Sequence, residues 1–287
     1  MINNLINKLS KKSNKDLVVK PVFHGTKDFD ASLSFLRSQK FIDFKKIENI
    51  LKIKFLKSEP LGNILINEKK EVVGFLGTIF GERYYKDNLI LLCNLHSWIV
   101  EKKYRYQSFQ LLIPIIRRNI LIFTFSPIKS LEGLYEKLGF KKKIICSKLI
   151  FFIPYKFKKK RFKYYSNNVY CEKFLSKSDL KIFKDYNNER FINLFFFDTK
   201  KNEHIYLVVK KTFKKTILPV IEIIYVSNIK SYYQNFYEIK LNLFLKFKTF
   251  FIVQNYNCHK KSFFYKKAYC LNFSSDLEID LLYSELS

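Results

Sequence analysis

Few side chains in this 287-residue sequence are suited to acid–base chemistry, and His96 is the first of them. An unperturbed imidazole titrates near neutral pH, so it can take a proton from a substrate. His96 lies in a strand-like run over 88–100, whose alternation predicts Asn94, His96 and Trp98 on one face. The alternative is a buried histidine that hydrogen-bonds a neighbouring carbonyl, and both interpretations stay open.

Other polar residues are weaker candidates for acid–base chemistry. Glu82 follows a predicted strand over 71–81 and can act on a proton through water, whereas Glu101 is expected at the surface. His24, His204 and His259 have no partner pattern. There is no Cys–His pair and no Gly-x-Ser-x-Gly turn, so we expect direct attack without a covalent enzyme intermediate.

A possible phosphate site lies in the stretch from Trp98 to Leu112, WIVEKKYRYQSFQLL, where a predicted strand passes into a helix through a basic turn. Backbone N–H groups at the start of a helix have no partner in the helix, and the helix dipole is positive there, so such junctions bind phosphate. Most such cradles contain glycine, and this turn has none. It is either a cofactor loop built without glycine or an ordinary connection.

The net charge of +28 suggests nucleic-acid binding, because clustered cations displace counterions from a phosphate backbone. Only seven of the 53 basic residues are arginine, however, and the sequence holds only two alanines, Ala31 and Ala268. Heavy use of Lys, Asn, Ile, Phe and Tyr is typical of an AT-rich genome, and the basic residues are spread along the chain. We therefore favour a compositional origin of the charge over nucleic-acid recognition.

The location expected from the sequence is cytoplasmic. No segment approaches the ~20 uninterrupted apolar residues of a membrane span, and the first residues lack the apolar run of a secretory signal. The five cysteines form an odd set without a C-x-x-C pair, which favours reduced thiols over a zinc site or a disulfide framework.

The elements expected around the candidate residues form a mixed α/β pattern. Strands are predicted over 16–23, 63–67, 71–81 and 88–100, then a helix over 104–118 that Pro114 shortens or kinks, then a strand over 120–125. A second helix runs from Pro127 to Leu138 and ends at Gly139, which supplies a left-handed stop. Two short strands, 142–146 and 148–154, complete this half.

The later part of the chain repeats this order as strand, strand, helix and strand over 204–213, 216–226, 231–247 and 249–256, at a near-constant offset. The sequence therefore predicts a polar tail over 1–15, a first domain over 16–154, a basic linker over 155–165 and a degenerate second copy over 166–287.

Two motifs in this order resemble the GNAT N-acyltransferase superfamily. Residues 99–112 are similar to its motif A, a Val-x-Pro-x-x-Arg-Gly-x-Gly-x-Gly loop that leads into a helix, and Leu134–Phe140 is similar to the end of its motif B. The likeness covers 16–154. It implies a mixed sheet that splays between its fourth and fifth strands to admit the pantetheine arm of acetyl-CoA or another acyl-CoA, with no metal.

The resemblance also implies roles for residues of the loop. The family glycines are replaced by Tyr106, Ser108 and Gln110, and a family asparagine by Ile128. Ser108 permits close approach of a phosphate, and Arg105 with Lys102 and Lys103 offsets the weaker cradle. The cofactor-binding residues implied are Trp98, Ile99, Val100, Arg105, Tyr106, Gln107, Ser108, Phe109 and Gln110.

The catalytic residues expected from the resemblance begin with Tyr135, whose position is that of a general acid for the departing thiolate. Its alternative is a tyrosine that packs with its hydroxyl in water. Backbone N–H groups near Ile99 or Val100 would polarise the thioester carbonyl. His96 and Glu82 are the candidates for the base. The second half has neither an equivalent loop nor an equivalent tyrosine.

Three functions are compatible with these residues. The first is acetylation or acylation of an amine on a small molecule or sugar. One bacterial branch of the superfamily has similar residues around these motifs, and that similarity points to surface-polysaccharide synthesis. The second is an inactive GNAT-fold binding or scaffold protein, suggested by Ser108, Gln110 and Ile128. The third is a basic protein that binds nucleic acid or uses a tRNA-linked donor.

Overall fold

The computed structural model describes residues 17–53, 55–85, 87–125, 127–151, 162–165, 174–198, 203–214, 217–257, 265–272 and 281–284. The predicted tail over 1–15 lies outside them, as does most of the predicted linker. Four of the linker residues, 162–165, form a strand instead.

The first half of the described chain alternates between strands and short helices. Its elements are β1 (Val18–Val22), α2 (Lys27–Ser38), α3 (Phe44–Leu51), β2 (Gly62–Ile66), β3 (Val72–Tyr85), β4 (Asn88–Val100), the 3₁₀ helix η1 (Lys102–Leu111), α4 (Ile113–Ile116), β5 (Leu121–Thr124), the 3₁₀ helix η2 (Lys129–Leu131), α5 (Glu132–Lys137) and β6 (Lys141–Phe151).

The second half has the same kind of order. Its elements are β7 (Phe162–Tyr165), α7 (Lys177–Asp185), β8 (Ile192–Asp198), β9 (Glu203–Lys214), β10 (Leu218–Val226), α8 (Ile229–Gln234), α9 (Phe236–Phe247), β11 (Phe251–Asn257) and β12 (Tyr265–Leu271). Strands β9, β10 and β11 begin 131, 130 and 130 residues after β3, β4 and β5.

All described strands belong to one mixed sheet in the order β1-β2-β3-β4-β5-β12-β6-β11-β10-β9-β8-β7. The order is symmetric between the two halves. If β1 is exchanged with β7, β2 with β8, and so on to β6 with β12, the result is the same strand order read from the other end of the sheet. The mixed α/β class expected from the sequence is confirmed.

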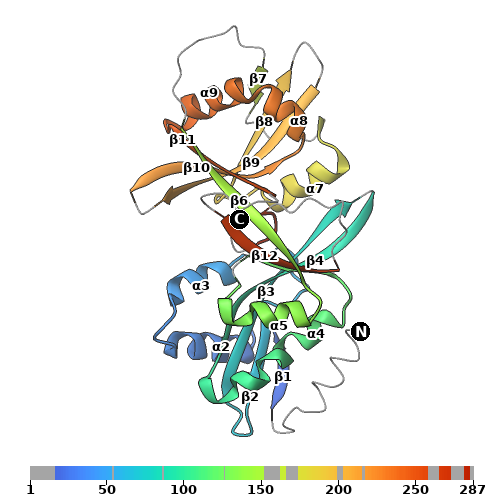
Figure 1. The fold of residues 1–287 in the computed structure, drawn as a ribbon, viewed down its shortest axis with the longest axis vertical. Helices are drawn as coiled ribbons and strands as arrows, with labels where there is room; N and C mark the ends of the chain where they lie inside the picture. Colours follow the sequence, from blue (N-terminus) through green and yellow to red (C-terminus); the bar gives the residue numbers. More distant parts are fainter. Residues whose placement is uncertain are drawn as a thin grey trace.

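The two halves are joined by an exchange of strands. β12, from the end of the chain, pairs antiparallel with β5, and β6 pairs antiparallel with β11. β12 and β6 also pair with each other at the centre of the molecule (Figure 1). The prediction of two separate short strands, 142–146 and 148–154, is wrong: β6 runs unbroken through Ser147, because β11 pairs with it continuously from Ile145 to Phe151. Residues 152–154 lie outside the described residues.

Helices cover both faces of the first half. Neighbouring residues of a strand point to opposite faces, and Ile64 and Phe75 pack with Leu36 of α2, whereas Leu65 and Leu76 pack with Leu112 next to η1. Helices α2 and α3 therefore cover one face, and η1, α4 and α5 cover the other. Each face has its own buried core.

Local signals set the ends of several helices. The side chain of Thr26 caps α2 and that of Asp43 caps α3, each accepting a backbone N–H hydrogen bond from the first turn. After α5, Gly139 has φ of 85°, as the predicted left-handed stop requires.

The fourth and fifth strands separate partway along. β4 pairs parallel with β5 at Leu92, Cys93 and Asn94, opposite Leu121, Ile122 and Phe123. β4 then continues to Val100 with no further pairing to β5, while β5 ends at Thr124 beside β12. The sheet thus opens where the resemblance places the splay.

Candidate functional site

A bulge in β4 sets the directions of the side chains near the opening. Phe75 is opposite Ile99 and Gly77 is opposite His96, so Leu76 alone faces the two residues Ser97 and Trp98. Ser97 has φ of 48°, in the left-handed region.

The bulge overturns the predicted face of Trp98. Trp98 packs in the same core as Leu95 and Val100, toward η1 and α5, whereas Ile99 packs toward α2 and α3. His96 points to the α2 side, where its ring lies against the position of a side chain at Gly77. The prediction that His96 and Trp98 share a face is therefore wrong, because a two-against-one bulge shifts the alternation by one residue.

Trp98 meets Tyr135 on the α5 side. The two rings are edge-on with centroids 5.9 Å apart, and both side chains are buried. Tyr135 also stacks on Tyr269 of β12 at 5.4 Å and meets Phe140 edge-on at 5.1 Å. The structure thus brings Tyr135, the expected acid, to the open part of β4, and Tyr269 supports it from the second half.

Tyr269, which sequence reasoning missed, is held by two carboxylates of α5. Its hydroxyl lies 3.2 Å from Glu132 and 3.4 Å from Glu136, and Lys267 lies 2.7 Å from Glu132. Burial and the hydrogen bond to Glu132 raise the pKa of Tyr269 to about 12. No local motif marks Tyr269, because its place beside α5 depends on the strand exchange.

His96 lies in an environment that keeps it neutral. Its Nδ1 lies 2.9 Å from Ser97 Oγ, and Nε2 is buried without a hydrogen-bond partner among the described residues. Burial lowers the pKa of His96 to about 3. Of the two sequence interpretations, the buried histidine describes its surroundings, although its partner is a hydroxyl and not a carbonyl.

Glu82 is not brought to His96. It is opposite Leu91 in the β3–β4 hairpin, five residues along β3 from Gly77, the partner of His96. At ~3.4 Å per residue this is about 17 Å. Any role of Glu82 at the bulge would need a long water chain.

The loop after β4 differs from the predicted helix. The expected α-helix over 104–118 is a 3₁₀ helix, η1, followed by one α-turn, α4, with Pro114 near its start. Residues three apart align in a 3₁₀ helix, and the stripe of Tyr104, Gln107 and Gln110 faces inward; both glutamines are buried. Gln110 donates to Gln107 at 2.6 Å, so an amide pair replaces the apolar stripe expected of an α-helix.

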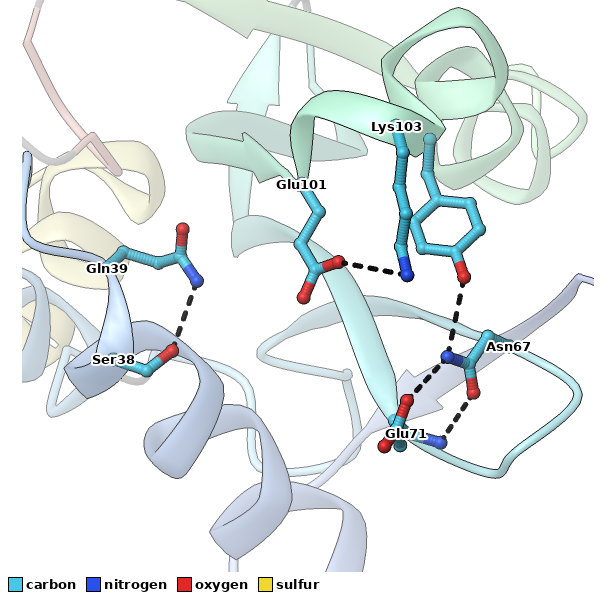
Figure 2. A network of polar contacts seen from close by, with 7 residues as sticks. Ser38, Gln39, Asn67, Glu71, Glu101 and Lys103 are labelled. Carbon is cyan, nitrogen blue, oxygen red and sulfur yellow. Dashed lines mark hydrogen bonds and ion pairs between the residues drawn. The ribbon is translucent and has the colours of Figure 1, made fainter.

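The inner stripe also ties η1 to the β2–β3 turn. Asn67 Nδ2 donates to the Glu71 carboxylate at 2.8 Å and reaches the Tyr104 hydroxyl at 3.5 Å, while the backbone N–H of Glu71 donates to the side-chain oxygen Oδ1 of Asn67 at 2.9 Å (Figure 2). The start of η1 is thereby held against the β2–β3 turn.

A pocket of about 450 Å³ lies at this corner. It is lined by Gln39, Phe41, Val100, Glu101, Lys102, Lys103 and Arg105. Figure 2 shows two of these lining residues, Gln39 just after α2 and Glu101 just after β4. Gln39 and the exposed Phe41 were missed from the sequence, because nothing there predicts that the α2–α3 connection reaches the loop.

Three cations surround the first turn of η1. Lys103 lies 4.0 Å from Glu101, and Arg105 Nε donates to the carbonyl of Val100 at 3.3 Å. Glu101, at the N-cap, makes no side-chain cap. The first N–H groups of η1 therefore have no side-chain acceptor from the cap residue, in a positive setting that suits an anion.

The remaining predicted loop residues divide by exposure. Tyr106 is 68% exposed, Ser108 and Phe109 are partly buried, and Ile99 and Val100 are buried. Tyr106 and Ser108 stand at glycine positions without positive φ. The 3₁₀ conformation thus accommodates side chains where the family has glycine.

The corresponding helix start in the second half has a side-chain cap. Asn228 caps α8 through its side chain, which accepts from Ser231 N–H at 2.9 Å. Tyr232 of α8 is fully buried. No cation lies in the first turn of α8 except Lys230.

Among the described residues, no cluster of three or more His, Cys, Asp or Glu side chains could hold a metal ion. The same ranges contain no helix with the length and apolarity of a membrane span. Cys93 and Cys270 are free and buried, but Cys146 is disulfide-bonded, contrary to the expectation of reduced thiols.

The sequence matches no family model and no curated protein, whereas its fold is similar to solved structures. A GCN5-related N-acetyltransferase from Anabaena variabilis has a TM-score of 0.60 at 11% identity, over 88% of this chain and 72% of that one. One from Kribbella flavida has a TM-score of 0.53 at 9% identity, over 90% and 72%. A putative acetyltransferase from Pyrococcus horikoshii has a TM-score of 0.50 at 11% identity, over 91% of both chains. The chain has the GNAT N-acyltransferase fold.

Proposed function

We propose that this chain is an acyl-CoA-dependent N-acyltransferase that acts on an amine of a small molecule or a sugar. The observation that carries the proposal is the corner between β4 and η1. There an uncapped helix start, three cations and a pocket of about 450 Å³ lie at the end of a strand that has parted from its neighbour.

The corner suits the diphosphate of coenzyme A. Helix N–H groups can donate to phosphate oxygens, and Lys102, Lys103 and Arg105 supply positive charge around them. From this corner the edge of β4 that does not pair with β5 leads toward Trp98, so the pantetheine arm would run along β4 past the bulge. Acetyl-CoA is the donor we propose, because the arm would end among large buried rings.

The reaction is direct transfer. The amine nitrogen attacks the thioester carbonyl carbon, the C–S bond breaks, and the electron pair leaves with sulfur as a thiolate. Backbone N–H groups near Ile99 or Val100 would stabilise the carbonyl oxygen. The hydroxyl of Tyr135 would protonate the thiolate; its support is its position beside Trp98 on the open part of β4.

Neither of the two candidate bases, His96 and Glu82, is placed to take the amine proton at the bulge. His96 is buried with a pKa lowered to about 3, so it holds a proton weakly, and Glu82 lies far along the hairpin. We assign His96 to hydrogen bonding on the α2 side of β4, with the amine entering already neutral and losing its proton to water.

The second half is, on this proposal, a copy without catalytic function. Its support is the strand order, which is the same from both ends, and the cap of Asn228 on α8. Through β12 it supplies Tyr269, which stacks on Tyr135. The second half would therefore contribute a supporting residue to the active site of the first half.

Calorimetry with acetyl-CoA tests the proposal. We expect saturable heat with acetyl-CoA and weaker heat with adenosine 3′,5′-bisphosphate, which keeps the 3′-phosphate and one of the two 5′-phosphates but lacks the pantetheine arm. Absence of heat at millimolar acetyl-CoA would overturn the proposed function.

A further inference from the structure

Trp98 has a buried polar atom that the described residues leave without a partner. Trp98 is 9% exposed, and its indole Nε1 is buried with no hydrogen-bond acceptor among the described residues. An indole N–H is a donor only and has no second way to be satisfied. Native proteins seldom leave such a donor unpaired, because its hydration is lost on folding without replacement.

The position of this donor coincides with the opening in the sheet. Trp98 follows the bulge residue Ser97, four residues beyond Asn94, where β4 last pairs with β5. The bulge turns Trp98 away from His96 and onto the side of Tyr135, whose ring it meets edge-on. Without the bulge the N–H would point toward α2 and α3.

We infer that the indole N–H of Trp98 donates a hydrogen bond to a carbonyl oxygen in the arm of a bound acyl-CoA. This inference rests on the proposed function and adds a binding contact from a side chain. Trp98 lies two residues before Val100 and three before Glu101, both of which line the pocket. At ~3.3 Å per residue it is about 7–10 Å from the phosphate corner, within reach of the arm.

The acceptor must be neutral. The rings around Trp98 are Tyr135 and its neighbours Phe140 and Tyr269, all buried. A phosphate or carboxylate would lose its hydration there, whereas an amide or thioester carbonyl accepts one hydrogen bond at small cost. The charged end of coenzyme A belongs at Lys102 and Arg105, and a carbonyl of its arm belongs at Trp98.

Trp98 is the single tryptophan of the chain, so one resonance reports this contact. In a ¹⁵N–¹H spectrum of the full-length protein, the indole N–H peak should move downfield on saturation with acetyl-CoA. Adenosine 3′,5′-bisphosphate should leave it in place. Free coenzyme A distinguishes the two possible acceptors. If the indole peak moves with both ligands, the acceptor is an amide of the arm; if it moves with acetyl-CoA alone, the acceptor is the thioester carbonyl.

Two results would separate failure of this inference from failure of the function. If calorimetry shows that acetyl-CoA binds but the indole peak stays in place, the hydrogen bond is refuted and the function stands. If acetyl-CoA gives no heat, the proposed function itself is refuted.

Trp98→Phe provides a second readout, because it keeps an aromatic ring and removes the N–H. We expect acetyl-CoA affinity to fall roughly threefold to tenfold, the range for one neutral hydrogen bond. Affinity for adenosine 3′,5′-bisphosphate should not change. Phe140→Leu is the matched control, since Phe140 also packs on Tyr135 but has no donor. Equal losses in both variants would overturn the inference in favour of packing.

Discussion

The imidazole of His96 occupies the space that a side chain at Gly77 would need. A Cβ atom built on Gly77 would lie 2.5 Å from His96 Nε2 and 2.6 Å from Nδ1, well inside van der Waals contact. The two residues are direct partners across β3 and β4, at the last pair before the bulge. A glycine is thus required at this position by the neighbouring ring and not by its own backbone angles.

Gly77→Ala should therefore destabilise the fold. We expect the free energy of unfolding to fall by about 1–3 kcal/mol, because the buried ring cannot move aside freely. Gly133→Ala in α5 is the matched control: no atom lies within 4 Å of its Cβ, so it should be neutral or stabilising by up to about 1 kcal/mol. Urea unfolding measures both.

A double-mutant cycle identifies the ring as the cause. In a His96→Ala background the cost of Gly77→Ala should shrink markedly, because the obstacle is gone. An unchanged cost would place the strain elsewhere.

The buried histidine should also make stability depend on pH. Burial lowers the pKa of His96 to about 3 from its ordinary 6.5, so between these values the unfolded chain binds a proton that the folded chain does not. Stability therefore falls as the pH falls below 6.5, by about 2 kcal/mol between pH 7 and pH 5. His96→Gln should lose that share of the acid sensitivity in urea titrations, and a parallel loss in both proteins would contradict it.

Tyr135→Phe tests the general acid. We expect kcat to fall about 100-fold or more while acetyl-CoA affinity is kept, because only protonation of the thiolate is removed. Tyr84→Phe, in the distant β3–β4 hairpin, is the control and should keep full turnover. Unchanged turnover in Tyr135→Phe would remove this residue from the mechanism.

Arg105→Ala tests the phosphate corner. Loss of one exposed cation should weaken acetyl-CoA binding roughly threefold to tenfold at low salt, and less at high salt because screening already weakens the contact. Arg117→Ala removes an exposed arginine at the end of α4 and should have no such effect. If both variants bind equally well, the donor does not lie at the β4–η1 corner.

Patterns that depend on neighbours in the sequence predicted most elements of the first half. The strand-like run over 88–100 predicted β4 with its observed bounds, and Gly139 marked the end of α5. The bulge could not be predicted, because it depends on how β4 pairs with β3. The extra residue in the bulge, Ser97, places Trp98 on the opposite face of the sheet from His96.

The conformation of the loop was missed for a different reason. Tyr104, Gln107 and Gln110 are three residues apart, which fits a 3₁₀ helix, but polar side chains at that spacing do not normally indicate a buried face. The two glutamines are buried as an amide pair, and the half-buried Tyr104 contacts Asn67 in the β2–β3 turn. Likewise, Tyr269 and the exchanged strands join segments over a hundred residues apart, beyond any local pattern.

The exchange of β6 and β12 has a consequence for synthesis on the ribosome. β5 has β4 on one side and finds its other neighbour in β12, so translation must pass Leu271 before the first half of the sheet is complete. Until then β5 has a bare edge, and Tyr135 has no Tyr269 to stack on. A nascent chain interrupted in its second half would contain every motif of the first half but would still lack the strand that pairs with β5.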